Sequence, residues 1–135
     1  MMSDQSASKK ILVVDDEKEV VQYLSSILQR ANYEVISTTQ GKQALELAFQ
    51  HKPDLIILDV LIPDLRGEEI YRLLSENQET AGIPIIFLTG IITEEDESFI
   101  QNLTGRSRLL AKPTTKEKIL DAIHKTLEDH GLSLS

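Results

Sequence analysis

Residues 11–16 read ILVVDD, an apolar run rich in β-branched side chains that ends in two acids. Such a run is typical of a strand buried on both faces of a parallel sheet. Similar runs occur at residues 55–59 (LIILD), 85–89 (IIFLT) and 109–112 (LLAK). The sequence therefore predicts buried strands that each deliver an acid, a hydroxyl or an amine at the carboxyl end.

Helical patterns alternate with these strands. Apolar residues recur at helical spacing in residues 17–31, 42–51, 66–77 and about 93–103, and in a last helix that we expect to stop at Gly131. Thr114 and Glu117 have the spacing of a capping box at the start of that last helix. Residues 33–38 form one further strand pattern. Five βα units in succession predict an α/β fold, (βα)5, doubly wound: a five-stranded parallel sheet in three layers, α/β/α.

The carboxyl ends of parallel strands share one edge of the sheet, where ligands bind. We therefore expect Asp15, Asp16, Asp59, Thr89 and Lys112 to meet in one pocket. Three neighbouring carboxylates repel one another and require a cation, which Mg²⁺ can supply with its preference for oxygen ligands. Asp59 is the best candidate nucleophile, because a carboxylate can attack phosphorus and form an acyl phosphate. The alternative is that the acids only form turns and cap helices.

Composition narrows the function classes. The chain has 135 residues, which suits one domain, and its net charge of −8 disfavours binding to nucleic acid or an anionic membrane. It has no cysteine, so thiolate catalysis and cysteine metal sites are excluded. We expect a disordered leader at residues 1–8, one domain at 9–131 and a tail at 132–135 without an output domain. A cytoplasmic location is also expected.

These motifs resemble the receiver domain of two-component response regulators over about residues 9–130. The resemblance rests on VVDDE at residues 13–17, LTG at 88–90, KP at 112–113, and the spacing of Asp59 from Pro63 and Gly67. It implies the flavodoxin-like receiver fold. It also implies that Asp59 is the phosphoacceptor, which takes a phosphoryl group from a phosphohistidine on a sensor histidine kinase or a histidine phosphotransfer protein.

The resemblance implies roles for the other polar residues as well. Asp16 and Asp59 match direct Mg²⁺ ligands, Asp15 a ligand through water, and the backbone carbonyl of Leu61 a third protein ligand. Thr89 matches a hydroxyl that turns toward the phosphoryl group. Lys112 matches the amine that pairs first with the acid and then with the phosphoryl oxygens, and the bond from Lys112 to Pro113 is expected to be cis.

The sequence departs from the family pattern at several positions. Leu109 stands where the family commonly has an aromatic residue that moves with the switch hydroxyl, and Thr114 stands where an aromatic often follows Lys-Pro. The positions two after Asp59 and two after Thr89 carry Leu61 and Ile91, which are apolar. Two apolar side chains would hinder an attacking water, so we expect slow self-dephosphorylation.

Three other functions stay open at this point. A pseudo-receiver would bind a partner without phosphorylation, and Leu109 favours that alternative. A flavodoxin would need a phosphate-cradling loop where residues 15–17 are all acidic, and a haloacid-type phosphatase would need a second acid where Leu61 stands. We expect no enzyme activity beyond phosphotransfer and dephosphorylation at Asp59 itself. The downstream target is unknown, and a homodimer is left open.

Overall fold

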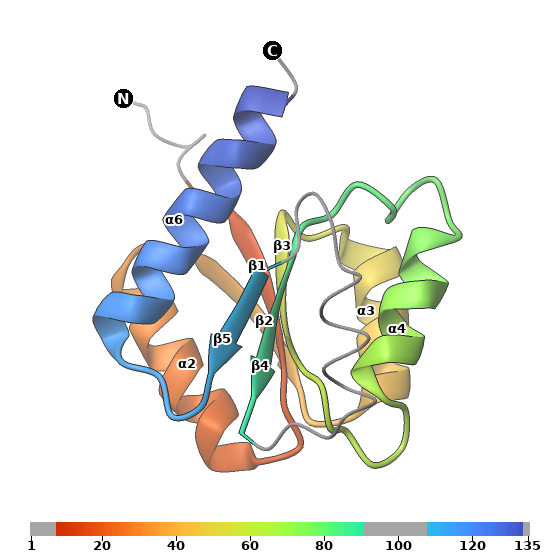
Figure 1. The fold of residues 1–135 in the computed structure, drawn as a ribbon, viewed down its shortest axis with the longest axis horizontal. Coiled ribbons are helices and arrows are strands. Elements are labelled where there is room, and N and C mark those ends of the chain that lie inside the picture. The colour runs from red at the N-terminus through yellow and green to blue at the C-terminus, as the bar shows by residue number, and fades with distance from the viewer. Residues whose placement is uncertain (1–7, 91–107, 134–135) are drawn as a thin grey trace.

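The computed structural model describes residues 8–90 and 108–133. Its five strands form one parallel sheet in the order β2-β1-β3-β4-β5 (Figure 1). The strands are β1 (Lys10–Val14), β2 (Glu34–Thr38), β3 (Leu55–Asp59), β4 (Ile85–Thr89) and β5 (Arg108–Ala111). The described helices are α2 (Lys18–Arg30), α3 (Gly41–His51), α4 (Gly67–Ser75) and α6 (Lys116–Ser133). The α/β fold expected from the sequence, with its five parallel strands, is confirmed.

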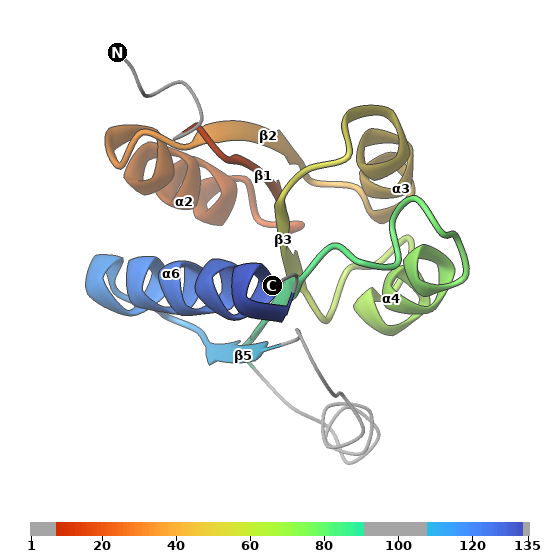
Figure 2. The ribbon, with the colours of Figure 1, turned by 90° about the horizontal axis from the view of Figure 1, so that it is seen from above.

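The helices cover both faces of the sheet, and the view from above separates the three layers (Figure 2). α2 and α6 lie on one face, and α3 and α4 lie on the other. This arrangement explains why β3 is apolar without alternation, since all five of its residues are buried. The edge strand β5 has instead an alternating pattern of partly buried and exposed residues.

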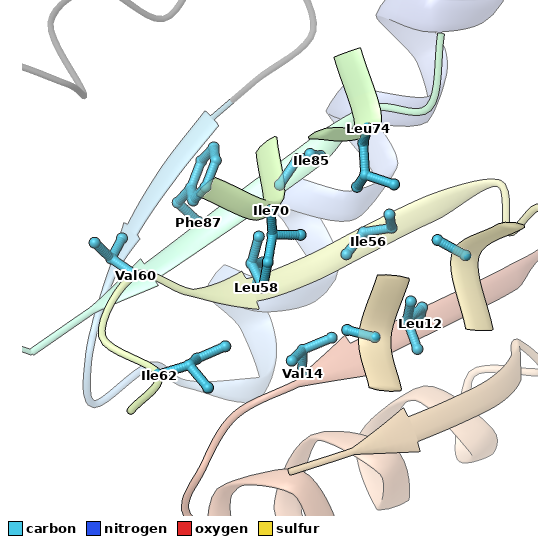
Figure 3. Close-up of a cluster of buried hydrophobic side chains, with 12 residues drawn as sticks. Leu12, Val14, Ile56, Leu58, Val60, Ile62, Ile70, Leu74, Ile85 and Phe87 are labelled. Carbon is cyan, nitrogen blue, oxygen red and sulfur yellow. The ribbon is translucent and has the colours of Figure 1, made fainter. Parts of the chain in front are cut away.

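One of the two cores lies between the sheet and the pair α3 and α4 (Figure 3). Side chains from β1, β3 and β4 meet Ile70 and Leu74 of α4 there. Each fully buried branched side chain stabilises the fold by about 1.5–3 kcal/mol before the entropy cost of ordering it. The cores on both faces therefore fix β1 and β3 in the centre of the sheet, and with them the residues that follow these strands.

The last helix differs from expectation at both of its ends. It does not stop at Gly131 but continues to Ser133, because a single glycine inside a helix costs only about 1 kcal/mol. Its start is capped by Thr115 and not by Thr114: the backbone N–H of Lys118 donates to Thr115 Oγ1 at 3.2 Å. The helix expected at about residues 93–103 lies outside the described residues.

Within residues 8–90 and 108–133, no helix combines the length and the apolar character that crossing a bilayer requires.

Candidate functional site

The acids expected to converge do so at the carboxyl edge of the sheet. Val14 of β1 pairs in register with Leu58 of β3, so the next residue of each strand, Asp15 and Asp59, reaches the same level. Asp16 lies beside them, and one carboxylate oxygen from each of the three acids lies within 4.8 Å of the others. Asp15 and Asp59 are buried, whereas Asp16 is exposed. This convergence favours a shared site over the alternative that the acids only form turns and cap helices.

Lys112 reaches this cluster from the segment that follows β5. Its ammonium Nζ lies 2.7 Å from Asp15 Oδ2, 3.0 Å from Asp59 Oδ2 and 3.3 Å from Glu17 Oε1. The backbone N–H of Lys112 also donates to the carbonyl of Thr89 at 2.8 Å, which ties the segment to β4. The peptide bond between Lys112 and Pro113 is cis, as the resemblance implied.

The charges in the pocket do not balance. The ammonium of Lys112 contacts three carboxylates, from Asp15, Glu17 and Asp59, and the carboxylate of Asp16 lies beside two of them, which leaves three negative charges among the named groups. Asp15 Oδ2 is fully buried, and its contact with Lys112 is an ion pair that lies off the hydrogen-bond direction. That oxygen therefore accepts no hydrogen bond, and the three aspartates have the donor chemistry of a site for a hard metal ion.

Asp59 and Lys112 shift each other's pKa. Burial raises the pKa of Asp59 from 3.8 to about 6, while hydrogen bonds from Lys112 and the N–H of Leu61 oppose this rise. Burial disfavours the ammonium of Lys112, but attraction by Asp15 and Asp59 outweighs it and holds the pKa of Lys112 above its usual value. A permanently charged ammonium thus faces a carboxylate that titrates close to neutral pH.

Backbone groups fix the orientation of both buried acids. The N–H of Leu61 donates to Asp59 Oδ1 at 3.1 Å, and the N–H of Glu17 donates to Asp15 Oδ1 at 2.9 Å. Each carboxylate therefore binds the chain two residues ahead with one oxygen and turns the other toward Lys112. This geometry leaves Asp59 Oδ2 and Asp15 Oδ2 facing the same cation.

Two glycines allow the loop after β3 to pack closely. A Cβ at Gly67 would lie 2.9 Å from the carbonyl oxygen of Asp59, so only glycine lets α4 start so near the end of β3. A Cβ at Gly41 would lie 2.7 Å from the carbonyl oxygen of Leu65. These contacts give a physical reason for the conspicuous spacing from Asp59 to Gly67.

Asp64 fastens the same loop to the start of α3. Its carboxylate accepts hydrogen bonds from the N–H groups of Gly41, at 2.8 Å, and Lys42, at 3.0 Å. These two donors hold the pKa of Asp64 below its usual value. Sequence reasoning missed this role of Asp64, because its partners lie more than twenty positions away and only the folded loop brings them together.

Thr89 closes β4 at the same edge. It is 3% exposed and pairs in register with Ala111, the residue before Lys112. Leu109, at the position where an aromatic residue was expected, is 41% exposed on the edge strand. Ile91 lies outside the described residues, so only Leu61 of the two apolar positions can be located, and it is partly buried against the α3 and α4 core.

An apolar hollow of about 510 Å³ adjoins Lys112 between α2 and the segment after β5. Val20, Tyr23 and Pro113 are among its lining residues, and Glu17 lies at its border with the acidic pocket. The hydroxyl of Tyr23 donates to the carbonyl of Thr114 at 3.2 Å. Tyr23 is 48% exposed, whereas Val21 of the same helix is buried.

Glu17 is a second site residue that sequence reasoning missed. It stands directly after the acid pair in the quoted motif, yet an exposed acid at a helix start is common and indicates no special role. Its contact with Lys112 spans 95 positions of sequence.

Comparison with known proteins agrees with this geometry. The chain is 30% identical over 122 residues to the polar-differentiation response regulator DivK of Brucella ovis, a match that covers 90% of this chain and 98% of that protein. The chemotaxis protein CheY4 of Vibrio cholerae has a similar structure, with a TM-score of 0.81, 30% identity, and coverage of 89% of this chain and 99% of that one.

A receiver domain protein of Methanospirillum hungatei shares the fold at a TM-score of 0.85 and 24% identity, covering 94% of this chain and 99% of that one. Residues 11–124 match the family described as the response regulator receiver domain. The expectation drawn from the acid pair, the Asp59 spacing and Lys112 is thereby confirmed. This chain belongs to the response regulator receiver domain family.

Proposed function

We propose that Asp59 is the phosphoacceptor of this receiver. The observation that carries the proposal is a buried carboxylate, 5% exposed, with a lysine ammonium 3.0 Å from its Oδ2 and two further acids beside it. A carboxylate oxygen of Asp59 attacks phosphorus, and the bond from phosphorus to the donor's imidazole nitrogen breaks. The electron pair of that bond stays on the nitrogen, and the product is an acyl phosphate.

The residues around Asp59 have separate tasks in this step. Lys112 offsets the charge that accumulates on the phosphoryl oxygens and keeps its proton, because its pKa lies above the usual value. The N–H of Leu61 holds the carboxylate in a fixed orientation through Asp59 Oδ1. Thr89 supplies a hydroxyl at the same edge of the sheet, and we assign it the contact with the phosphoryl group.

The donor set favours Mg²⁺ as the partner of the remaining negative charge. Asp16 and Asp59 would hold the ion directly, Asp15 would hold it through water, and the backbone carbonyl of Leu61 would add a protein ligand. When bound, the ion neutralises charge on the acids and on the incoming phosphoryl oxygens. The unsatisfied Asp15 Oδ2 supports this assignment.

Phosphorylation would act as a switch by adding negative charge at Asp59, which shifts a two-state equilibrium and alters a binding surface. We infer a sensor histidine kinase or a histidine phosphotransfer protein as the donor, and a cytoplasmic site for the exchange. The output surface inferred from the family spans about residues 94–131, of which residues 94–107 lie outside the described part. A homodimer through this surface stays open, and the net charge of −8 disfavours nucleic acid as a direct partner.

The second candidate is a pseudo-receiver that binds a partner without being phosphorylated. The exposed Leu109 favours it, because this side chain lacks the aromatic ring that in the family commonly moves together with the switch hydroxyl. The complete set of Asp59, Lys112 and neighbouring acids favours the phosphoacceptor.

Acetyl phosphate with Mg²⁺ separates the two candidates. We expect the wild-type protein to gain the mass of one phosphoryl group, and Asp59→Asn to gain none. Glu46→Gln, at an exposed position of α3, is the matched control and should gain the group as the wild type does. A wild-type protein that stays unmodified with Mg²⁺ present would support the pseudo-receiver.

A further inference from the structure

The ammonium of Lys112 has a third carboxylate partner besides the two buried aspartates. Glu17 Oε1 lies 3.3 Å from Nζ and comes from the residue that precedes α2. The side chain of Glu17 is 61% exposed, whereas those of Asp15 and Asp59 are 0% and 7% exposed. The three partners of Lys112 therefore differ in how freely they can move away.

A lysine ammonium has three N–H donors and no acceptor. Two of them donate to Glu17 Oε1 and Asp59 Oδ2, and Asp15 Oδ2 lies 2.7 Å from the same nitrogen as an ion-pair partner. A phosphoryl group on Asp59 needs at least one of these donors for its own oxygens. Asp15 is fixed by burial and by the N–H of Glu17, so it cannot withdraw. Glu17 can turn into water at little cost.

We propose that Glu17 is a positioning residue: before phosphorylation it accepts a hydrogen bond from one N–H group of Lys112, and it competes for that group with the incoming phosphoryl oxygens. The inference rests on the proposed function of Asp59. In this arrangement Glu17 slows phosphorylation in two ways: it occupies an N–H group of Lys112 that the phosphoryl oxygens would otherwise use, and its charge repels an anionic phosphoryl donor at the border of the pocket.

Two variants separate the contact from the charge. Glu17→Gln keeps the length of the side chain and removes the charge. Glu17→Asp keeps the charge and withdraws the carboxylate by one methylene, which breaks a contact that is already 3.3 Å long. Glu19→Gln is the matched control, since Glu19 is an exposed acid in the first turn of the same helix and faces away from Glu17.

The experiment follows phosphoryl uptake from acetyl phosphate by intact mass, at fixed Mg²⁺ and ionic strength. We expect Glu17→Gln to raise the uptake rate about three- to tenfold at subsaturating donor, the size of one charge interaction at the edge of a solvated pocket. Glu17→Asp should raise it by a smaller factor, and Glu19→Gln should match the wild type.

A second readout does not depend on phosphorylation. The side-chain Nζ and Cε resonances of Lys112 should shift in Glu17→Gln and Glu17→Asp without donor or metal, and stay in place in Glu19→Gln. Unchanged resonances in both Glu17 variants would overturn the inference, as would equal or slower uptake by Glu17→Gln. A wild type that takes up no phosphoryl group would overturn the proposed function itself, and this inference with it.

Discussion

Asp59→Asn is expected to make the protein more stable at neutral pH, although it removes the residue proposed to react. Burial raises the pKa of Asp59 from 3.8 to about 6. Each pKa unit corresponds to 1.36 kcal/mol, so holding the ionised carboxylate in the folded protein costs about 3 kcal/mol above pH 6. Asparagine has nearly the same shape and carries no charge to desolvate.

The pKa of about 6 already includes the attraction of Lys112. An amide has only one acceptor oxygen, however, so the variant loses one of the two hydrogen bonds that Asp59 accepts, from Lys112 Nζ at 3.0 Å and from the N–H of Leu61 at 3.1 Å. A net contribution of about 1 kcal/mol for the lost hydrogen bond leaves an expected stabilisation of about 2 kcal/mol. The Lys112 ammonium keeps Asp15 and Glu17 as partners in the variant, so it does not become an unpaired buried charge.

The effect depends on pH in a defined direction. Because the folded-state pKa of Asp59 lies above the unfolded value, the protonated residue stabilises the wild type fully below pH 3.8. That contribution is lost as the pH rises through about 6. The advantage of Asp59→Asn should therefore be largest at pH 7.5 and shrink steadily as the pH falls toward 4.

Urea unfolding without Mg²⁺, at pH 7.5 and at pH 4.5, measures this difference. With a slope of about 2 kcal/mol/M, the midpoint of Asp59→Asn should lie about 1 M above that of the wild type at pH 7.5. Glu46→Gln controls for the loss of one exposed acid. Equal midpoints at pH 7.5, or an advantage that grows as the pH falls, would refute the reasoning.

Three further changes have definite expected outcomes. Lys112→Met leaves Asp15 and Asp59 without their cation and should lower the free energy of unfolding by about 3 kcal/mol at pH 7.5, with partial recovery when Mg²⁺ is added to the urea titration. Asp64→Ala removes the acceptor of two N–H groups at the start of α3 and should cost about 1–2 kcal/mol at pH 7. Because the folded-state pKa of Asp64 is lowered, this cost should fade as the pH drops through that pKa, and a cost that persists at pH 2 would contradict the capping role. Leu61→Asn should speed phosphoryl loss several-fold in a decay time course, since a polar side chain two residues after Asp59 can orient water; an unchanged decay would remove Leu61 as the cause.

The strands of the sheet could be predicted because the pattern that indicates each strand lies within a few consecutive residues. The run ILVV at residues 11–14 has no polar interruption, and only a strand covered on both faces buries it fully. Once parallel strands are expected, the position of Asp15, Asp59 and Lys112 at strand ends fixes their convergence without any knowledge of loop shape. The resemblance to the receiver family added the roles of these residues, which spacing alone leaves open.

The contacts of Glu17 and Asp64 could not be predicted in the same way. Both side chains lie on loops or at helix starts, where an acid ordinarily caps the nearest helix or faces water. Glu17 instead meets Lys112, and Asp64 caps α3 from the loop after β3. The cap of α6 differed from expectation for a related reason, because Thr114 and Thr115 are adjacent hydroxyls and backbone geometry decides between them.

The most direct test is to locate the phosphoryl group on the chain. The protein is incubated with acetyl phosphate and Mg²⁺, the acyl phosphate is reduced with borohydride, and the peptides are sequenced by mass spectrometry. Our account predicts that residue 59 is converted to homoserine in the wild type, and that the conversion is lost when Mg²⁺ is chelated. Conversion at Asp15 or Asp16, or none at residue 59 while the protein is folded and metal is present, would contradict it.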